Sequence, residues 1–245
     1  MKKLIYLLPI TILISCNQPK VSINPPSVTQ PLLNIPIMIY MEGDSTMVGA
    51  NGAYPDAITP NNPPNLLQKL LLPKYPNVLT FNWGKGGSML PDSIDGTDGY
   101  GAPLAERLLL IPSNQIILTN DAHNEAGNYY AEGMTTEAAT ALYSANLENW
   151  INIVLAAGDV PVLQEPNPAI CWGAQLPPMI MVQHALASKY NITIIEIYNY
   201  ILAIPNWQNL LIDACVHPSD QLYAIIAQLE YDQLLPIIQS LESNQ

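Results

Sequence analysis

Three residues that could together perform acyl transfer lie near opposite ends of the 245-residue chain. Ser45 stands in 42-EGDSTMVG-49, directly after an apolar run, and Asp213 and His217 stand in 213-DACVHPSD-220. A serine hydroxyl is a weak nucleophile that needs a neighbouring base, usually histidine, to accept its proton. The histidine in turn needs an acceptor for its other nitrogen. Because Gly-Asp-Ser also suits an ordinary turn, the nucleophile hypothesis for Ser45 depends on these partners.

Three histidines are candidates for the base. His184 falls in the middle of an expected helix, where a packing or surface role is the ordinary interpretation. His123 lies in the loop after the third expected strand and could contact the pocket. His217 precedes the last expected helix and has Asp213 four residues before it, so it is the best candidate, because imidazole titrates near neutral pH. The alternative role for His217 is that of a residue near a helix N-cap.

Expected strands and helices alternate along the chain. Near-continuous apolar runs, typical of strands buried on both faces, predict strands at 36–41, 78–83, 115–120, 160–165 and 192–197. Helices are expected at 64–75, 102–110, 136–158, 177–190 and 218–241, and the last contains Pro236, a site for a kink or a restart. This alternation predicts a parallel sheet covered on both faces, in one three-layer α/β domain.

In such a sheet, functional residues gather in the loops that follow the carboxyl ends of the strands. The loop 82-NWGKGGSM-89 has three glycines within four positions, and 120-NDAHNEAG-127 has two asparagines. Glycine backbone N–H groups and asparagine amides are donors that can stabilise an oxyanion, each by roughly 3–4 kcal/mol. The loop 165-EPNPAICW-172 is expected to line the same pocket, although no single residue in it can be assigned a chemical role.

Four blocks in this order resemble the SGNH (GDSL) hydrolase superfamily. They are Gly43-Asp44-Ser45, Asn82-x-Gly84-x-x-Gly87, the asparagine loop after the third strand, and His217-Pro218. The resemblance extends over residues 36–240. It implies a three-layer α/β/α sandwich with a mainly parallel, five-stranded, flavodoxin-like sheet.

The resemblance also implies a role for each block. Ser45 would be the nucleophile, and its backbone N–H would share the oxyanion hole with that of Gly87. In the third block, 122-AHNE-125 keeps the spacing of the family pattern G-x-N-D, which favours Asn124 as the amide donor. Asn120 is the alternative, because Asn120-Asp121 matches the N-D dipeptide but follows the strand immediately.

The last block departs from the family pattern D-x-x-H. Ala214 occupies the position expected for the aspartate, and Asp213 stands one residue earlier. A bulged loop could still bring Asp213 to the imidazole of His217. The alternatives are a Ser–His dyad without a third member, or a contribution from Asp220.

The N-terminus has the pattern of an export signal. A basic head, Met1-Lys2-Lys3, precedes the apolar run 4–14, which is too short to span a bilayer as a helix and suits a signal peptide. The run ends in 13-LISC-16, which resembles a bacterial lipobox in which Cys16 would be lipidated; a plain secretory signal is the alternative. Asn17 is not the aspartate typical of retention at the inner membrane, so the outer membrane is favoured. The expected division is a lipoprotein signal peptide at 1–16, a proline-rich tether at 17–36, and a hydrolase domain at 37–245.

Charge and cysteine usage exclude several functions. The net charge of −12, with 20 acidic and 8 basic residues, argues against nucleic-acid binding, which needs clustered Lys and Arg.

Cys171 and Cys215 suggest one disulfide in an exported protein, with two separate thiols as the alternative. They lack C-x-x-C spacing and the histidines are scattered, so a metal site is not expected. No Walker-type phosphate loop is present, and the expected chemistry needs no cofactor.

The resemblance therefore implies a lipid-anchored serine esterase. Superfamily members hydrolyse acetylated carbohydrates, lysophospholipids, thioesters and simple aryl esters. For an envelope lipoprotein, an O-acetylated polysaccharide or a lipid ester is the expected substrate. The alternatives are a sugar O-acyltransferase, and a catalytically silent envelope-binding lipoprotein.

Overall fold

The computed structural model describes residues 35–52 and 57–244. The expected signal peptide at 1–16, its lipobox Cys16, and residues 17–34 of the expected tether lie outside the described residues. Within the described ranges, no helix is both long and apolar enough to cross a membrane.

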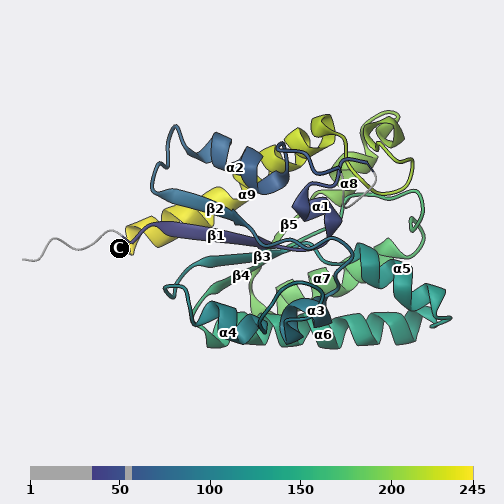
Figure 1. Ribbon diagram of the computed structural model, residues 1–245, viewed down its shortest axis with the longest axis horizontal. Helices are drawn as coiled ribbons and strands as arrows, with labels where there is room; N and C mark the ends of the chain where they lie inside the picture. Colours follow the sequence, from purple (N-terminus) through teal and green to yellow (C-terminus); the bar gives the residue numbers. More distant parts are fainter. Residues whose placement is uncertain (1–34, 53–56, 245) are drawn as a thin grey trace, which may run out of the picture. The chain divides into compact units, whose positions relative to one another are not determined.

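The five expected strands form one sheet in which every neighbouring pair is parallel (Figure 1). The strand order is β2-β1-β3-β4-β5, which is the flavodoxin-like doubly wound order. The bounds are Ile37–Glu42 (β1), Val78–Asn82 (β2), Ile116–Thr119 (β3), Val160–Gln164 (β4) and Thr193–Ile195 (β5). The expected α/β class with a parallel five-stranded sheet is confirmed.

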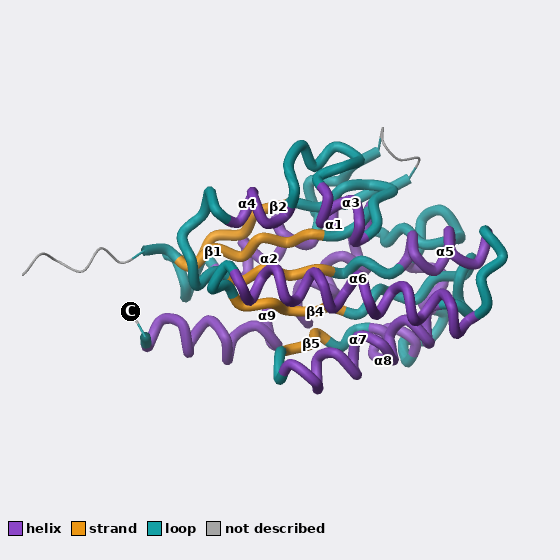
Figure 2. The backbone as a smooth tube through the Cα atoms, turned by 90° about the horizontal axis from the view of Figure 1, so that it is seen from below, coloured by secondary structure: helices purple, strands orange, loops and turns teal. Residues whose placement is uncertain are grey.

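Helices cover both faces of this sheet (Figure 1). One face carries Ser45–Val48 (α1), Pro63–Leu71 (α2), Tyr198–Leu202 (α8) and Asp220–Ser243 (α9). The other carries Leu90–Asp95 (α3), Leu104–Leu108 (α4), His123–Ala131 (α5), Thr136–Ala156 (α6) and Leu176–Tyr190 (α7). Figure 2 shows this second face, with the long α6 lying over the sheet and running along the direction of the strands. A short 3₁₀ turn at Trp207–Leu210 completes the described elements.

Alternate residues of the central strand β3 face the two helical layers. Ile116 and Leu118 pack into the core beneath α2 and α9, whereas Ile117 packs into the core formed with α6 and α7. All three side chains are fully buried. Because neither face of this strand meets solvent, its sequence is a continuous apolar run and does not alternate between apolar and polar residues.

Several helix boundaries differ from the expected ones. The helix expected over 102–110 ends at Leu108, and Leu109 and Leu110 are 81% and 84% exposed. The apolar run had extended the prediction into residues that contribute nothing to the core. The stretch 120–127 was expected to be a loop, but α5 begins within it at His123. The last helix does not restart at Pro236, because α9 continues through it.

A buried ion pair links β1 to the helices beneath it. Glu42, the last residue of β1, is fully buried and pairs with Arg107 of α4. Its other oxygen accepts hydrogen bonds from Ser93 Oγ (3.0 Å) and from Trp150 Nε1 (2.8 Å). Since a buried carboxylate without such partners is strongly destabilising, these contacts fix the end of β1, where Ser45 follows.

A second buried carboxyl predicts a pH dependence of stability. Burial in α9 raises the pKa of Glu230 from 4.5 to about 8. Between these values the folded chain holds one proton more than the unfolded chain, so stability should fall as the pH rises, by up to about 1.4 kcal/mol per pH unit. Glu230→Gln should flatten this fall in urea unfolding measured at pH 5 and pH 8. The exposed Glu242→Gln is the control, and an unchanged slope in Glu230→Gln would contradict the assignment.

Candidate active site

Ser45 is the first residue of α1 and follows β1 through a tight turn. Asp44 caps this helix, and its Oδ1 accepts hydrogen bonds from Thr46 N (2.7 Å) and Thr46 Oγ1 (2.8 Å). Gly43 has φ +141°, and a Cβ there would lie 1.8 Å from Asn120 Oδ1. A side chain at position 43 would therefore meet both a backbone penalty and a clash. The Gly-Asp-Ser sequence thus forms a turn that also presents Ser45 at the end of the strand.

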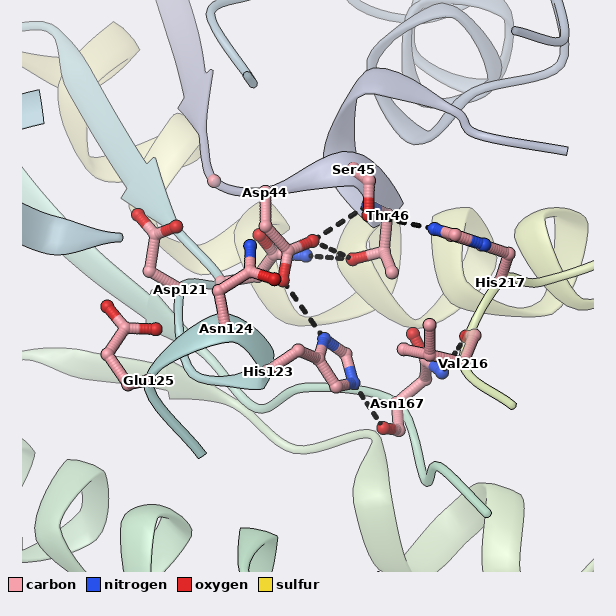
Figure 3. A network of polar contacts seen from close by, with 12 residues as sticks. Asp44, Ser45, Thr46, Asp121, His123, Asn124, Glu125, Asn167, Val216 and His217 are labelled. Atoms are coloured by element: carbon pink, nitrogen blue, oxygen red, sulfur yellow. Dashed lines mark hydrogen bonds and ion pairs between the residues drawn. The ribbon is translucent and has the colours of Figure 1, made fainter. Parts of the chain in front are cut away.

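His217 contacts the serine directly. Its Nε2 lies 2.9 Å from Ser45 Oγ, although 172 residues separate them in the sequence (Figure 3). The loop that carries His217 closes on itself, because Ile212 N donates to His217 O (3.0 Å) and Leu211 pairs with Pro218. The structure therefore brings together the two residues that the sequence predicted as nucleophile and base.

Asp213 reaches the histidine despite its displaced position in the sequence. Its Oδ2 lies 2.6 Å from His217 Nδ1, but the contact lacks the angle of a hydrogen bond. Its Oδ1 accepts from the backbone N–H groups of Cys215 (2.9 Å), Val216 (2.9 Å) and His217 (3.1 Å). Partial burial alone would raise the carboxyl pKa, but these donors and the charge of His217 hold the pKa of Asp213 below its ordinary value.

The extra residue between Asp213 and His217 is absorbed by a bulge at Ala214. Ala214 has φ +54°, a left-handed conformation that costs a non-glycine residue about 1–2 kcal/mol. The three backbone N–H groups that donate to Asp213 Oδ1 belong to the same turn, and these hydrogen bonds offset the cost of the left-handed conformation. This is the bulged loop that the D-A-C-V-H spacing requires.

Asp220, the alternative partner of His217, is engaged elsewhere. Its carboxylate accepts hydrogen bonds from Asn51 Nδ2, Thr59 Oγ1 and Asn61 Nδ2, each at 2.8 Å. These bonds tie the start of α9 to the segment before α2. The structure therefore contradicts a contribution of Asp220 to the histidine.

The backbone N–H groups of Ser45 and Gly87 were the expected oxyanion donors, and both residues line one pocket. Among residues 35–52 and 57–244, no acceptor binds the N–H of Ser45 or of Gly87. Gly87 has φ +86°, and the loop that carries it is held in place because Lys85 N donates to Gly43 O (2.7 Å). Asn82 also braces this loop, since its Oδ1 accepts from Gly84 N (3.0 Å). Free donors in a braced loop can bind an oxyanion without reorganisation.

Asn124 faces the same space from the start of α5. Its Nδ2 donates to Ser88 O (2.8 Å), which orients the amide and leaves its second N–H available. A pocket of about 200 Å³ opens there, lined by Ser45, Gly87, His123, Asn124, Trp172, Val216 and His217.

Asn120, the alternative amide donor, does not line this pocket. It is 4% exposed, and its Nδ2 donates to Thr46 Oγ1 (2.9 Å), next to Ser45 in the sequence. Of the two asparagines, only Asn124 lines the pocket. Asn120 is a supporting residue at the end of β3.

Trp172 is a pocket residue that the sequence did not single out. It follows Cys171 and packs against Gly127 of α5, where a Cβ would lie 2.9 Å from Trp172 Cε2. His184, by contrast, lies outside this pocket on α7 and pairs with Glu165 at 2.7 Å. The sequence signal for Trp172 was its position at the end of the loop 165–172, which follows a strand and was expected to line the pocket.

The predicted Cys171–Cys215 disulfide is present. It joins the loop after β4 to the turn that carries His217. Two hydrogen bonds reinforce the connection, from Ile170 N to Cys215 O (2.7 Å) and from Asn167 Nδ2 to Val216 O (3.0 Å).

Reduction of this disulfide should lower thermal stability. The bond spans 44 residues of sequence, and a cross-link of that length typically contributes about 2–4 kcal/mol, or roughly 4–16 °C in Tm for a chain of this size. Circular dichroism melting with and without dithiothreitol measures the effect. The Cys171→Ser/Cys215→Ser variant should show a low Tm in both conditions. Equal melting of the wild type with and without reductant would be the contrary result.

Two buried carboxyls, those of Asp121 and Glu125, lie beside Asn124 (Figure 3). Burial raises the pKa of Glu125 to about 7, and burial with the charge of Glu125 raises the pKa of Asp121 well above its usual range. Glu125 Oε1 accepts from Leu90 N (2.8 Å), so it ties α5 to the start of α3. Nowhere in 35–52 or 57–244 do three His, Cys, Asp or Glu side chains gather as metal ligands.

No protein-family model matches the sequence, and no curated protein matches it. Solved structures do match. A lipase/acylhydrolase from Enterococcus faecalis is 18% identical with a TM-score of 0.61, over 81% of this chain and 95% of the other. A candidate SGNH hydrolase from Slackia heliotrinireducens is 16% identical with a TM-score of 0.60, over 81% and 99%. A lipolytic G-D-S-L family member from Veillonella parvula is 14% identical with a TM-score of 0.61, over 80% and 97%. The chain thus has the α/β fold of the GDSL/SGNH hydrolases.

Proposed function

We propose that the protein is an SGNH-type serine hydrolase that cleaves carboxylic esters. The observation that carries the proposal is the 2.9 Å contact between Ser45 Oγ and His217 Nε2, with Asp213 behind the imidazole. His217 accepts the serine proton as Ser45 Oγ attacks the ester carbonyl. The protonated imidazole then donates that proton to the leaving alcohol, and water releases the acyl group by the same route.

The oxyanion is held by three donors that converge on the pocket. They are the N–H groups of Ser45 and Gly87 and the side-chain amide of Asn124. Because the backbone donors have no partner within the described protein, they are available at the moment when charge develops on the carbonyl oxygen. The chain's own residues complete the reaction, and no step calls for a cofactor or a metal.

The pocket supports a short acyl group, such as acetyl. Its volume of about 200 Å³ is below the range of about 300–1,000 Å³ common for drug-sized ligands. Trp172 supplies an aromatic wall, on which a sugar ring of an acetylated carbohydrate could stack. An O-acetylated polysaccharide therefore fits better than a long-chain lipid ester.

The proposal is tested by hydrolysis of p-nitrophenyl acetate and p-nitrophenyl octanoate by the wild-type chain. We expect turnover of the acetate well above the uncatalysed rate, and a kcat/KM at least about tenfold higher for acetate, equivalent to about 1.4 kcal/mol. An added sugar acceptor in the same assay detects acyl transfer. Absence of turnover with every short-chain ester and acetylated glycan tried would refute the proposal.

Asn124→Ala should lower kcat by about 10²–10³-fold, as the loss of one oxyanion donor does. The matched variant is Asn120→Ala, which removes an amide that faces Thr46 instead of the pocket. It should lower Tm with a much smaller effect on kcat. Steady-state kinetics of the two purified variants decides between the asparagines, and a larger kcat loss in Asn120→Ala would reverse the assignment.

We further propose that Cys16 carries a lipid that attaches the protein to the bacterial outer membrane. The support is the run 4-LIYLLPITILISC-16, followed by Asn17. The full chain, expressed in a bacterium, should partition into the detergent phase of Triton X-114. Cys16→Ser should partition into the aqueous phase, and equal partitioning of the two would count against lipidation.

A further inference from the structure

A chain of polar contacts adjoins the candidate pocket, and neither Ser45 nor His217 belongs to it (Figure 3). We call it the positioning chain; its members are Asp44, His123, Asn167 and Val216. His123 Nδ1 lies 3.1 Å from Asp44 Oδ2, and His123 Nε2 lies 2.8 Å from Asn167 O. Asn167 Nδ2 then donates to Val216 O at 3.0 Å. The side chains of Asp44 and His123 are each 1% exposed, and Asn167 is 2% exposed.

Three members of the positioning chain are sequence neighbours of residues in the proposed mechanism. Asp44 precedes Ser45, His123 precedes Asn124, and Val216 precedes His217. The fourth member, Asn167, follows β4 and links His123 to Val216. The positioning chain therefore connects the segments that carry the proposed nucleophile, amide donor and base.

The contacts define where the protons of His123 lie. A backbone carbonyl can only accept, so His123 Nε2 donates to Asn167 O. Asp44 Oδ1 already accepts from Thr46 N and from Thr46 Oγ1, so His123 faces the remaining carboxylate oxygen, Oδ2. Burial would raise the carboxyl pKa, but His123 and these donors lower the pKa of Asp44, so Oδ2 remains an acceptor. Both ring nitrogens of His123 thus face oxygens that accept hydrogen bonds.

We infer that His123 is a positioning residue, whose two ring N–H groups fix the positions of Ser45, Asn124 and His217 relative to one another. This inference rests on the proposed hydrolase mechanism. Each ring nitrogen faces an oxygen that accepts hydrogen bonds, so one imidazole links the Asp44 turn to the Asn167 loop. Misplacement of reacting groups by about 1 Å can cost 10²-fold in rate, so a rigid link between three loops has a direct effect on kcat.

The kinetic test compares His123→Gln with His184→Gln. His184 is the matched control, because it also pairs with a carboxylate but lies outside the pocket. His123→Gln should lower kcat for p-nitrophenyl acetate by about 10²-fold with KM changed by less than about twofold. His184→Gln should leave both constants unchanged. A His123→Gln variant with wild-type kcat would overturn the inference.

Asn167→Ala breaks the positioning chain at a second point and leaves the pair of Asp44 and His123 intact. It removes the bond to Val216 O but keeps the backbone carbonyl that binds His123. We expect a kcat loss of about tenfold, the rate equivalent of one ordinary hydrogen bond. An unchanged kcat in this variant would remove Asn167 and Val216 from the positioning chain and overturn the three-loop link.

A third measurement needs neither activity nor a folded His123 variant. In wild-type protein labelled with ¹⁵N-histidine, His123 should show two slowly exchanging ring N–H signals at the pH of the assay. His184→Gln and His217→Gln identify the signals of the other two histidines. A single ring N–H signal for His123 would overturn the inference even if the esterase is active. Two signals in a protein that hydrolyses no ester would support the proton arrangement while refuting the proposed function.

Discussion

Ser45→Ala is expected to lower kcat for p-nitrophenyl acetate by about 10⁴- to 10⁶-fold, the loss seen when a serine nucleophile is removed from a catalytic triad. The reason is that no other hydroxyl lies within hydrogen-bond distance of His217 Nε2 in the described chain. Structure should be retained, because the backbone bonds and the Asp44 cap that form α1 do not involve Ser45 Oγ.

The measurement is steady-state hydrolysis by purified wild type and Ser45→Ala, with Tm as the check on folding. Residual activity above the uncatalysed rate is compatible with the mechanism, since oxyanion donors and substrate binding remain. A kcat within tenfold of wild type, at unchanged Tm, would be incompatible with nucleophilic attack by Ser45.

His217→Gln should cause a loss of similar size, about 10⁴- to 10⁶-fold, because serine cannot give up its proton without the base. Asp213→Asn should lower kcat by about 10⁴-fold, as replacement of a triad aspartate does. The three backbone donors can still bind an amide oxygen at the position of Oδ1, so the turn should persist. The amide group would then face His217 Nδ1 and favour the wrong tautomer.

The double variant Ser45→Ala/His217→Gln shows whether the two residues act as one unit. Its kcat should be close to that of either single variant, since each change alone already disables proton transfer from serine. Losses that multiply would mean that Ser45 and His217 contribute independently. That result would contradict the triad, whatever the size of each single effect.

The strands and the edge of the sheet that carries the site could be predicted because they follow from local pattern and general rules. The continuous apolar runs at β1, β3 and β4 identify strands buried on both faces, and parallel strands bring their following loops to one edge. Helix ends were harder. Leu109 and Leu110 continue an apolar run, but α4 has already ended, and only the packed structure shows that these leucines face outward.

Within the candidate site, the meeting of Ser45 and His217 could be predicted from residue type and from position at loop ends. Features that depend on contacts between distant residues could not. The bulge at Ala214 was left open, because its left-handed backbone is stabilised by the three bonds to Asp213. His123 was placed only near the pocket, since its partners Asp44 and Asn167 are 79 and 44 residues away.

Mass spectrometry of the protein after reaction with a fluorophosphonate probe shows whether Ser45 is a nucleophile activated by His217. We expect one adduct per chain, located on the peptide that contains Ser45, with no adduct in Ser45→Ala and strongly slowed labelling in His217→Gln. A wild-type chain that stays unmodified while it hydrolyses esters, or one that is labelled at another residue with Ser45→Ala still reactive, would contradict this role of Ser45.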